Sequence, residues 1–208
     1  MRAMAVKSGR YRGMTAQERA AARRAQLVEA ALEVWGREGG PRITMTLVCN
    51  EAGLTERYFY ESFSRLEEVL IAVLEQIGDR IRTDGLRAIE ETEGGPTERV
   101  RAALAAFVHV MTDDPRVGRV VTLEAPSWPE LRGPRNAMTR AFAAIVADEG
   151  RLLYGEEALP ERDAVLQSLM FIGGVEELMT AWLDGTIDAT PAEIVEAATL
   201  MFTRTGHR

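Results

Sequence analysis

The sequence predicts an all-α fold made of a short N-terminal domain and a larger helical domain that follows it. Apolar residues recur at helical spacing over almost the whole chain, strand signals are nearly absent, and glycine and proline residues separate the helical stretches. Residues 1–65 hold 11 Arg or Lys against 7 Asp or Glu, a net of +4, whereas residues 66–208 hold 14 against 25, a net of −11. This uneven charge indicates two domains with different tasks.

The bulk composition is that of a soluble globular protein. The 208 residues, of which 46% are hydrophobic and 27% charged, are enough to bury a core. No apolar run approaches the roughly 20 residues that cross a bilayer, and no signal-peptide pattern follows the basic N-terminus. The only cysteine, Cys49, excludes an intramolecular disulfide and a clustered-thiolate metal site, and we expect it to be a small buried hydrophobe. These features predict a cytoplasmic protein that does not enter a membrane.

The first expected elements are a basic arm, residues 1–14, and a helix that begins at Thr15. Thr15-Ala16-Gln17-Glu18 has the reciprocal capping-box pattern of a helix start. Gly39-Gly40-Pro41 should end this helix. The arm either contacts a partner through its cations or forms a solvated tail; these cations are Lys7, Arg10 and Arg12.

Two short helices should follow, Met45 to Glu51 and Thr55 to Ser62, with Gly53 between them. A second capping-box pattern, at Ser64-Arg65-Leu66-Glu67, predicts a long helix that runs to about Glu91. Its apolar side consists of Leu70, Val73, Leu74, Ile77 and Ile81.

The rest of the chain should be helical between glycine and proline breaks. Ala125-Pro126-Ser127-Trp128-Pro129 is the clearest break, and Thr190-Pro191-Ala192-Glu193 is the clearest helix start. One helix is expected from Thr97 to about Thr112, and a short one should follow it to Leu123. The next should pass through Met138 and Leu152, with Pro134 as a possible kink near its start. The last two are expected from Pro160 to Asp184-Gly185 and from Thr190 to about Thr203.

The stretch from Thr44 to Phe63 carries the strongest functional signal. Two helices too short to be stable alone meet at Gly53, which is helix-turn-helix geometry. Phe59 and Phe63 are spaced i and i+4 and should face the core. The side chains expected to point outward, towards phosphates and base edges in a major groove, are Arg57, Tyr58 and Tyr60. From spacing alone, an ordinary tight helical corner remains open.

The sequence from Ala52 to Leu70 resembles the signature of the TetR family of transcriptional repressors: Ala-Gly-Leu-Thr-x-x-x-Phe-Tyr-x-x-Phe-x-x-x-Glu-Glu-Val-Leu. Ala181-Trp182-Leu183-Asp184-Gly185 and the helix start at Thr190-Pro191 are similar to that family's penultimate and last helices. The resemblance implies a three-helix helix-turn-helix DNA-binding domain, residues 15–63, joined to a helical effector-binding and dimerisation domain, residues 64–208. It also implies DNA contacts by Thr44, Thr55, Tyr58 and Tyr60, with Tyr60 on a phosphate.

The motif departs from the family pattern in its charges. Leu66 replaces the usual lysine, and Glu56 and Glu61 add acids to the second short helix. We expect Arg57, which replaces a common glycine, and Arg65 to compensate. The full set of residues expected to bind DNA is Arg42, Thr44, Thr55, Arg57, Tyr58, Tyr60 and Arg65.

The helix between Leu166 and Leu183 is apolar nearly all round, so it needs burial on two sides. Gly173-Gly174 would let another helix come close. We expect a twofold dimer, which suits the two half-sites of a pseudo-palindromic operator; the alternative is that these helices fill a monomeric core. The residues expected at the dimer interface are Leu169, Ile172, Gly173, Val175, Trp182, Ile194, Ala198, Met201 and Phe202.

The family resemblance also implies a site for a small, largely apolar effector among the middle helices. Met and aromatic side chains suit adaptable apolar pockets, although each is also a usual core residue. The expected lining residues are Phe107, His109, Met111, Trp128, Met138, Phe142 and Phe171. Binding there should release the protein from its operator, as in a repressor, and activation remains open.

The sequence contains no pattern that predicts an enzyme. The chain has two histidines and one cysteine, and it lacks a nucleophile elbow, a phosphate-binding glycine loop and clustered metal ligands. We therefore expect no catalytic residue, metal or cofactor. The alternative from another class is a helical adaptor that binds protein through an apolar face.

Overall fold

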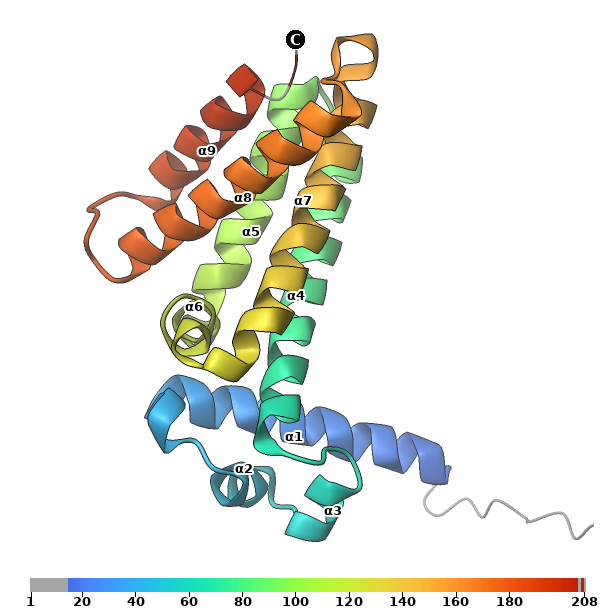
Figure 1. Cartoon of the computed structure of the whole chain (residues 1–208), viewed down its shortest axis with the longest axis vertical. Coiled ribbons are helices and arrows are strands. Elements are labelled where there is room, and N and C mark those ends of the chain that lie inside the picture. Colours follow the sequence, from blue (N-terminus) through green and yellow to red (C-terminus); the bar gives the residue numbers. More distant parts are fainter. Residues whose placement is uncertain (1–14, 206, 208) are drawn as a thin grey trace, which may run out of the picture. The chain divides into compact units, whose positions relative to one another are not determined.

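A computed structural model describes residues 15–205 and residue 207, and this part of the chain is helical (Figure 1). The helices are α1 (Ala16–Glu38), α2 (Met45–Ala52), α3 (Glu56–Tyr60), α4 (Leu66–Glu91), α5 (Pro96–Asp113), α6 (Pro115–Arg119), α7 (Arg132–Tyr154), α8 (Glu161–Leu183) and α9 (Pro191–Thr205). Over the described ranges the only β pairing is an isolated bridge between Ala158 and His207. The predicted all-α fold is confirmed.

The chain forms two compact units, which divide between Val73 and Leu74. The sequence placed the domain boundary after Phe63, whereas the compact units divide inside α4, which begins in the first unit and continues in the second. The basic arm, residues 1–14, lies outside the described residues.

The first unit is built on the inner face of α1, which packs against α2 and α3. Thr15 caps α1 as predicted: its hydroxyl accepts from the Glu18 N–H, and the Glu18 carboxylate accepts from the Thr15 N–H. The Gln26 side-chain amide donates to the Ala52 carbonyl oxygen at 2.6 Å and so ties α1 to the end of α2. The fully buried side chains of this unit include Leu27, Ala31, Val34, Trp35, Val48 and Phe59.

The second unit is a helical bundle in which α7 packs on α8, and α9 packs on both α5 and α8. Between α6 and α7 the chain forms a π-helical turn, Val120–Glu124, and then short 3₁₀ turns. The sequence predicted an ordinary short helix to Leu123 there. The Thr122 hydroxyl donates to the Gly118 carbonyl oxygen at 2.8 Å, so a side chain satisfies a backbone acceptor beside the widened turn.

Two of the predicted helix starts are wrong in detail. α5 is capped by Gly95, whose N–H donates to the Glu98 carboxylate at 3.0 Å, and not by Thr97. Pro96 stands at the first helical position of α5, where a proline is itself a start signal. Before α4 the Ser64 N–H donates to Glu68 at 2.7 Å instead of to Glu67. The predicted start of α9 is confirmed by the reciprocal bonds between Thr190 and Glu193.

α8 meets the length and the mean hydropathy, 1.2, of a membrane-crossing segment. The prediction that no apolar run approaches that length is therefore wrong for α8. Length and composition are weak evidence, because the core helices of soluble proteins pass the same test. In this fold α8 packs against α7 and α9.

Candidate nucleic-acid interface and cavity

The turn between α2 and α3 is fixed by Gly53, which has left-handed backbone angles, φ 62° and ψ 29°. A residue with a Cβ rarely adopts this conformation. The Gly53 and Leu54 N–H groups donate to the carbonyl oxygens of Asn50 and Cys49 at 3.1 and 2.9 Å and so close the end of α2. At the other end of α2, the Thr44 hydroxyl accepts from the Leu47 N–H at 3.2 Å. The predicted corner is therefore present in the first unit.

The two faces of α3 differ sharply in exposure. Phe59 is fully buried and Phe63 nearly so, and their rings lie 5.7 Å apart. On the other face, 84% of the Arg57 side chain and 59% of Tyr60 are exposed. Thr55 occupies the N-cap position of α3, and its hydroxyl makes no capping bond there. Arg57 and Tyr60 thus lie on the exposed face of a helix whose opposite face is held in the core by Phe59.

Tyr58 does not share this outward position. It is half-buried, and the Arg23 guanidinium of α1 lies 4.5 Å from the centre of its ring. Arg23 also pairs with the Glu61 carboxylate at 3.2 Å, and Arg57 pairs with the other oxygen of Glu61 at 3.3 Å. The carboxylate of Glu61, the residue that follows α3, therefore lies between two guanidinium groups. The sequence motif missed Arg23 because it lies on another helix, far from α3 in the sequence.

The other residues expected to bind DNA also lie in this first unit. Arg42 and Thr44 are exposed, and the Thr44 hydroxyl is already used in capping α2. Arg65 is exposed and lies 3.9 Å from Glu67 and 3.8 Å from Glu68, both at the start of α4. Glu56 accepts from the Thr46 hydroxyl at 3.4 Å across the corner. The acids of this region are thus held by local contacts.

Cys49 lies in the core of the first unit. It is buried, as expected, with only 3% of the residue exposed. Burial raises the pKa of its thiol, and the nearby Glu56 carboxylate raises it further. The thiol is therefore held in its unreactive protonated form.

A cavity of about 240 Å³ lies within the second unit. Helices α4, α5, α7 and α8 contribute most of its lining, with residues from the π-helical turn and one from α9. Five of the seven residues expected to line a pocket do so: Phe107, Met111, Met138, Phe142 and Phe171. His109 is exposed and lies outside the lining. It follows Phe107 by two residues, and two residues of an α-helix differ in direction by about 200°, so the two side chains lie on opposite faces. Trp128, beside the 3₁₀ turns, also lies outside the lining.

The lining of the cavity is mainly apolar, with a few charged and hydroxyl side chains. Arg82 donates to Asp79 at 2.8 Å, and the Thr139 hydroxyl donates to the Glu176 carboxylate at 3.0 Å. Burial raises the pKa of the Glu149 carboxyl, and the negative charges of Asp148 and Glu90 raise it further. The polar members of the lining are Arg82, Thr122, Arg135, Thr139, Glu149, Glu176 and Thr180.

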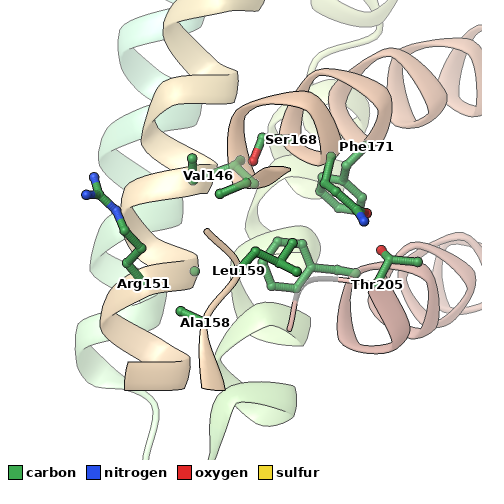
Figure 2. A pocket seen from close by; sticks show the side chains of 12 residues that line it. Val146, Arg151, Ala158, Leu159, Ser168, Phe171 and Thr205 are labelled. Atoms are coloured by element: carbon green, nitrogen blue, oxygen red, sulfur yellow. The ribbon is translucent and has the colours of Figure 1, made fainter. Parts of the chain in front are cut away.

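A second hollow lies between α7, α8 and the end of α9, as Figure 2 shows. Val146, Leu159 and Phe171 gather around it, whereas the Arg151 guanidinium extends away (Figure 2). Its volume of about 20 Å³ suits one water molecule and no larger ligand.

The residues expected at a dimer interface fall into two groups. Val175, Ile194, Ala198 and Phe202 are buried inside this chain's own core, so they are not displayed to a second copy. Leu169, Ile172 and Trp182 are partly exposed, and the Trp182 indole donates to the Ala189 carbonyl oxygen at 2.7 Å. Gly173 and Met201 are exposed. The sequence pattern missed the large apolar residues that α8 and α9 expose, namely Val165, Leu166, Met170 and Leu200.

The corner in the first unit and the helical second unit together define a class of protein, the helix-turn-helix proteins with a helical C-terminal domain. No family model matches the chain. Among curated relatives it is 33% identical over 82 residues to the HTH-type transcriptional regulator BetI of Rhizobium meliloti (strain 1021), covering 39% of this chain and 40% of that protein. It is 31% identical over 99 residues to the HTH-type transcriptional activator FasR of Mycolicibacterium smegmatis, covering 48% of this chain and 45% of FasR. The chain thus matches less than half the length of these relatives.

Solved structures match over nearly the whole chain. FadR, the fatty acid degradation regulator from Bacillus halodurans, superposes with a TM-score of 0.73 at 21% identity and covers 89% of this chain and 97% of FadR. A TetR family transcription regulator from Marinobacter aquaeolei VT8 gives a TM-score of 0.62 at 17% identity, covering 92% of this chain and 100% of that one. In its fold the chain is similar to TetR-family transcriptional regulators, and in the aligned stretches of its sequence it is similar to HTH-type transcriptional regulators. The curated relatives are named transcriptional regulators, which is the class of protein that the sequence motif predicts.

Proposed function

We propose that the protein is a transcriptional regulator that binds a pseudo-palindromic DNA operator as a dimer. The exposure of α3 is the observation that carries this proposal. Arg57 and Tyr60 project from a helix whose opposite face is anchored by the fully buried Phe59. A guanidinium and a phenol hydroxyl so displayed donate hydrogen bonds to phosphates and to base edges in a major groove. Thr44, Thr55, Arg42 and Arg65 are further proposed contacts around them.

The dimer is proposed to form through the exposed apolar side chains of α8 and α9. Met170 is 70% exposed and Leu166 is 52% exposed, and large apolar side chains gathered on a soluble protein mark an interaction surface. Gly173 and Met201, from the expected set, are exposed on the same two helices. A twofold axis would give the two α3 helices the symmetry of an operator with two half-sites.

The cavity of the second unit is proposed to bind a small, largely apolar effector that releases the DNA. Its Met and aromatic lining supports this assignment. FadR from Bacillus subtilis, solved in complex with stearoyl-CoA, has a similar fold, with a TM-score of 0.70 at 23% identity, covering 88% of this chain and 99% of FadR. The effector must bind the released state more tightly than the DNA-bound state. We favour repression; the relative FasR is named an activator, so the direction of regulation needs its own reporter assay.

Selection of DNA from a random pool at controlled salt tests the proposal. We expect a palindromic consensus whose affinity falls as salt rises, because cations of the protein displace counterions from phosphates. Arg57→Ala and Tyr60→Ala should each weaken binding by about 1–3 kcal/mol if they contact bases. Arg140→Ala, an exposed arginine on α7, is the matched control. If no sequence is enriched, the protein is better explained as a helical adaptor.

A further inference from the structure

The charged lining of the cavity is arranged along one face of α7. Arg135, Met138, Phe142, Ile145 and Glu149 all line the cavity from this helix, at the spacing of one helical face. Arg135 and Glu149 stand at the two ends of this row. At 1.5 Å per residue their backbones lie about 21 Å apart along the helix axis. On this face of α7 a cation and an acid therefore stand about four turns apart, with apolar side chains between them, while Leu153 continues the lining beyond Glu149. Glu176 adds a second acid, held by Thr139 one turn from Arg135.

Arg135 is the cation of the lining that has no carboxylate partner among the described residues. It is half-buried, and within the described part of the chain no carboxylate lies within ion-pair distance of its guanidinium. Arg82, the other cation of the lining, is already paired with Asp79. An arginine stays charged at every physiological pH, and its planar group matches a carboxylate in two parallel hydrogen bonds. Arg135 thus offers an anion a complementary partner.

Glu149, on the same face of α7, has the opposite character. Burial and the neighbouring charges of Asp148 and Glu90 raise the pKa of Glu149, which makes its carboxyl easier to neutralise. An anion placed beside Glu149 would be repelled, whereas an apolar tail there would favour the neutral form. Glu176, the remaining acid of the lining, is exposed and accepts a hydrogen bond from Thr139.

The cavity volume limits the size of the ligand. An engineered apolar cavity of about 150 Å³ binds benzene, which has six carbon atoms. By proportion, a cavity of about 240 Å³ takes a ligand of roughly ten non-hydrogen atoms. A saturated carboxylate with eight carbons has that size.

We propose that the cavity binds a medium-chain carboxylate, with its carboxylate on the Arg135 guanidinium and its hydrocarbon tail along Met138 and Phe142 towards Glu149. The proposal rests on the proposed effector-binding function of the same cavity and names the chemical class of the effector. The anionic head group, and not merely an apolar body, decides which ligand binds. A neutral compound of the same shape leaves the guanidinium partly desolvated without a partner.

Calorimetric titration of the full-length protein, in the absence of DNA, tests the proposal. The probes are octanoate, 1-octanol, octylamine and octanoyl-CoA, which separate a free carboxylate from a neutral, a cationic and a thioester head group. We expect octanoate to bind at least about tenfold more tightly than 1-octanol, because a hydrogen bond to a charged group strengthens binding by about that factor or more. Arg135→Gln should remove the preference for octanoate, and Glu149→Gln should leave it unchanged or strengthen it.

Arg140→Gln is the control, since Arg140 lies on the same helix, is exposed and does not line the cavity. Circular dichroism must show that each variant folds, and Arg135→Lys, which keeps a point charge, should retain part of the preference if Gln does not fold. Equal binding of octanoate and 1-octanol overturns the proposal, as does unchanged octanoate binding by Arg135→Gln. Preferential binding of octylamine or of octanoyl-CoA also overturns it. Because no DNA is present, failure here leaves the DNA-binding proposal standing, and failed DNA selection leaves this one standing.

Discussion

At the scale of single residues, the contacts of Glu61 show how the negative charge of an acid beside the proposed DNA-binding helix is neutralised. Its carboxylate is held between Arg23 of α1 and Arg57 of α3, at 3.2 and 3.3 Å. Arg23 also covers the ring of Tyr58. The sequence motif predicted that Arg57 and Tyr60 are exposed, because their spacing relative to Phe59 fixes the face on which they lie. It misplaced Tyr58, because the partner that covers this ring belongs to another helix.

Arg23→Ala should weaken operator binding by several-fold, roughly 0.5–1 kcal/mol, the size of a partly exposed ion pair. The substitution leaves Glu61 less neutralised near the proposed phosphate contacts. Adding Glu61→Gln to Arg23→Ala should restore part of the affinity. A double-mutant cycle in a gel-retardation assay measures the coupling. Strictly additive effects of the two substitutions would contradict the proposed arrangement.

Asp114 predicts how the second unit responds to acid. The Arg116 side chain donates to the Asp114 carboxylate and holds the pKa of that carboxyl below its usual value, although partial burial opposes the shift. A lowered pKa means that the ionised group contributes stability above the ordinary aspartate pKa of about 3.9, and that this stability is lost as the pH falls through the lower folded pKa. Asp114→Asn should therefore reduce stability at neutral pH and reduce its loss in acid. Thermal unfolding between about pH 2 and pH 6 measures both effects. Parallel pH curves for the two proteins would exclude this role.

At the scale of helices, the sequence predicted those with strong end signals and missed those whose starts depend on a neighbour. The reciprocal pattern at Thr15 and the one at Thr190 both form as written. The segment between Asp113 and Arg132 was predicted only in outline, because its π-helical turn and 3₁₀ turns depend on contacts with α5, α7 and α8. Local propensity does not encode such contacts.

Gly118 gives a prediction for this segment. A Cβ added there would lie 2.6 Å from the backbone carbonyl oxygen of Met111 and 3.1 Å from Leu183, so backbone would have to move. Gly118→Ala should destabilise the second unit by about 1–3 kcal/mol. Gly133→Ala, in the first turn of α7, meets no atom within 4 Å and should be neutral or stabilising by up to about 1 kcal/mol. Chemical denaturation measures the free energy of unfolding of each variant. Equal values for the two variants would show that the backbone around Gly118 moves away from Met111 without loss of stability.

At the scale of the whole molecule, the sequence located part of the cavity lining but not the exposed apolar surface of α8. Five of the seven residues expected around a pocket line the cavity, because Met and aromatic side chains concentrate there. α8 was identified as a helix that needs burial on two sides, but a helix that is apolar all round does not reveal which side faces its own domain. Val175 turned inward, whereas Met170 remains 70% exposed.

The exposed face of α8 leads to a prediction about assembly. Met170→Glu should convert the proposed dimer to a monomer, because a buried and unpaired charge at an interface is strongly unfavourable. Leu123→Glu, which alters an exposed apolar residue on the π-helical turn, should leave the assembly intact. Light scattering at micromolar concentration gives the mass of each variant. A single 23.0 kDa species for the unmodified chain would exclude the dimer outright.

The buried thiol of Cys49 makes the local opening of the first unit measurable. A thiol-specific reagent can modify it only when the first unit opens, since the residue is 3% exposed and its pKa is raised by burial. Cys49 is the only cysteine of the chain, so the mass increase of the intact protein counts these openings without any engineered label. The labelling rate should fall when operator DNA is bound, and it should be insensitive to Gly118→Ala if the two units open independently. The opening rate of the first unit can thus be measured separately from that of the second, without any substitution in the sequence.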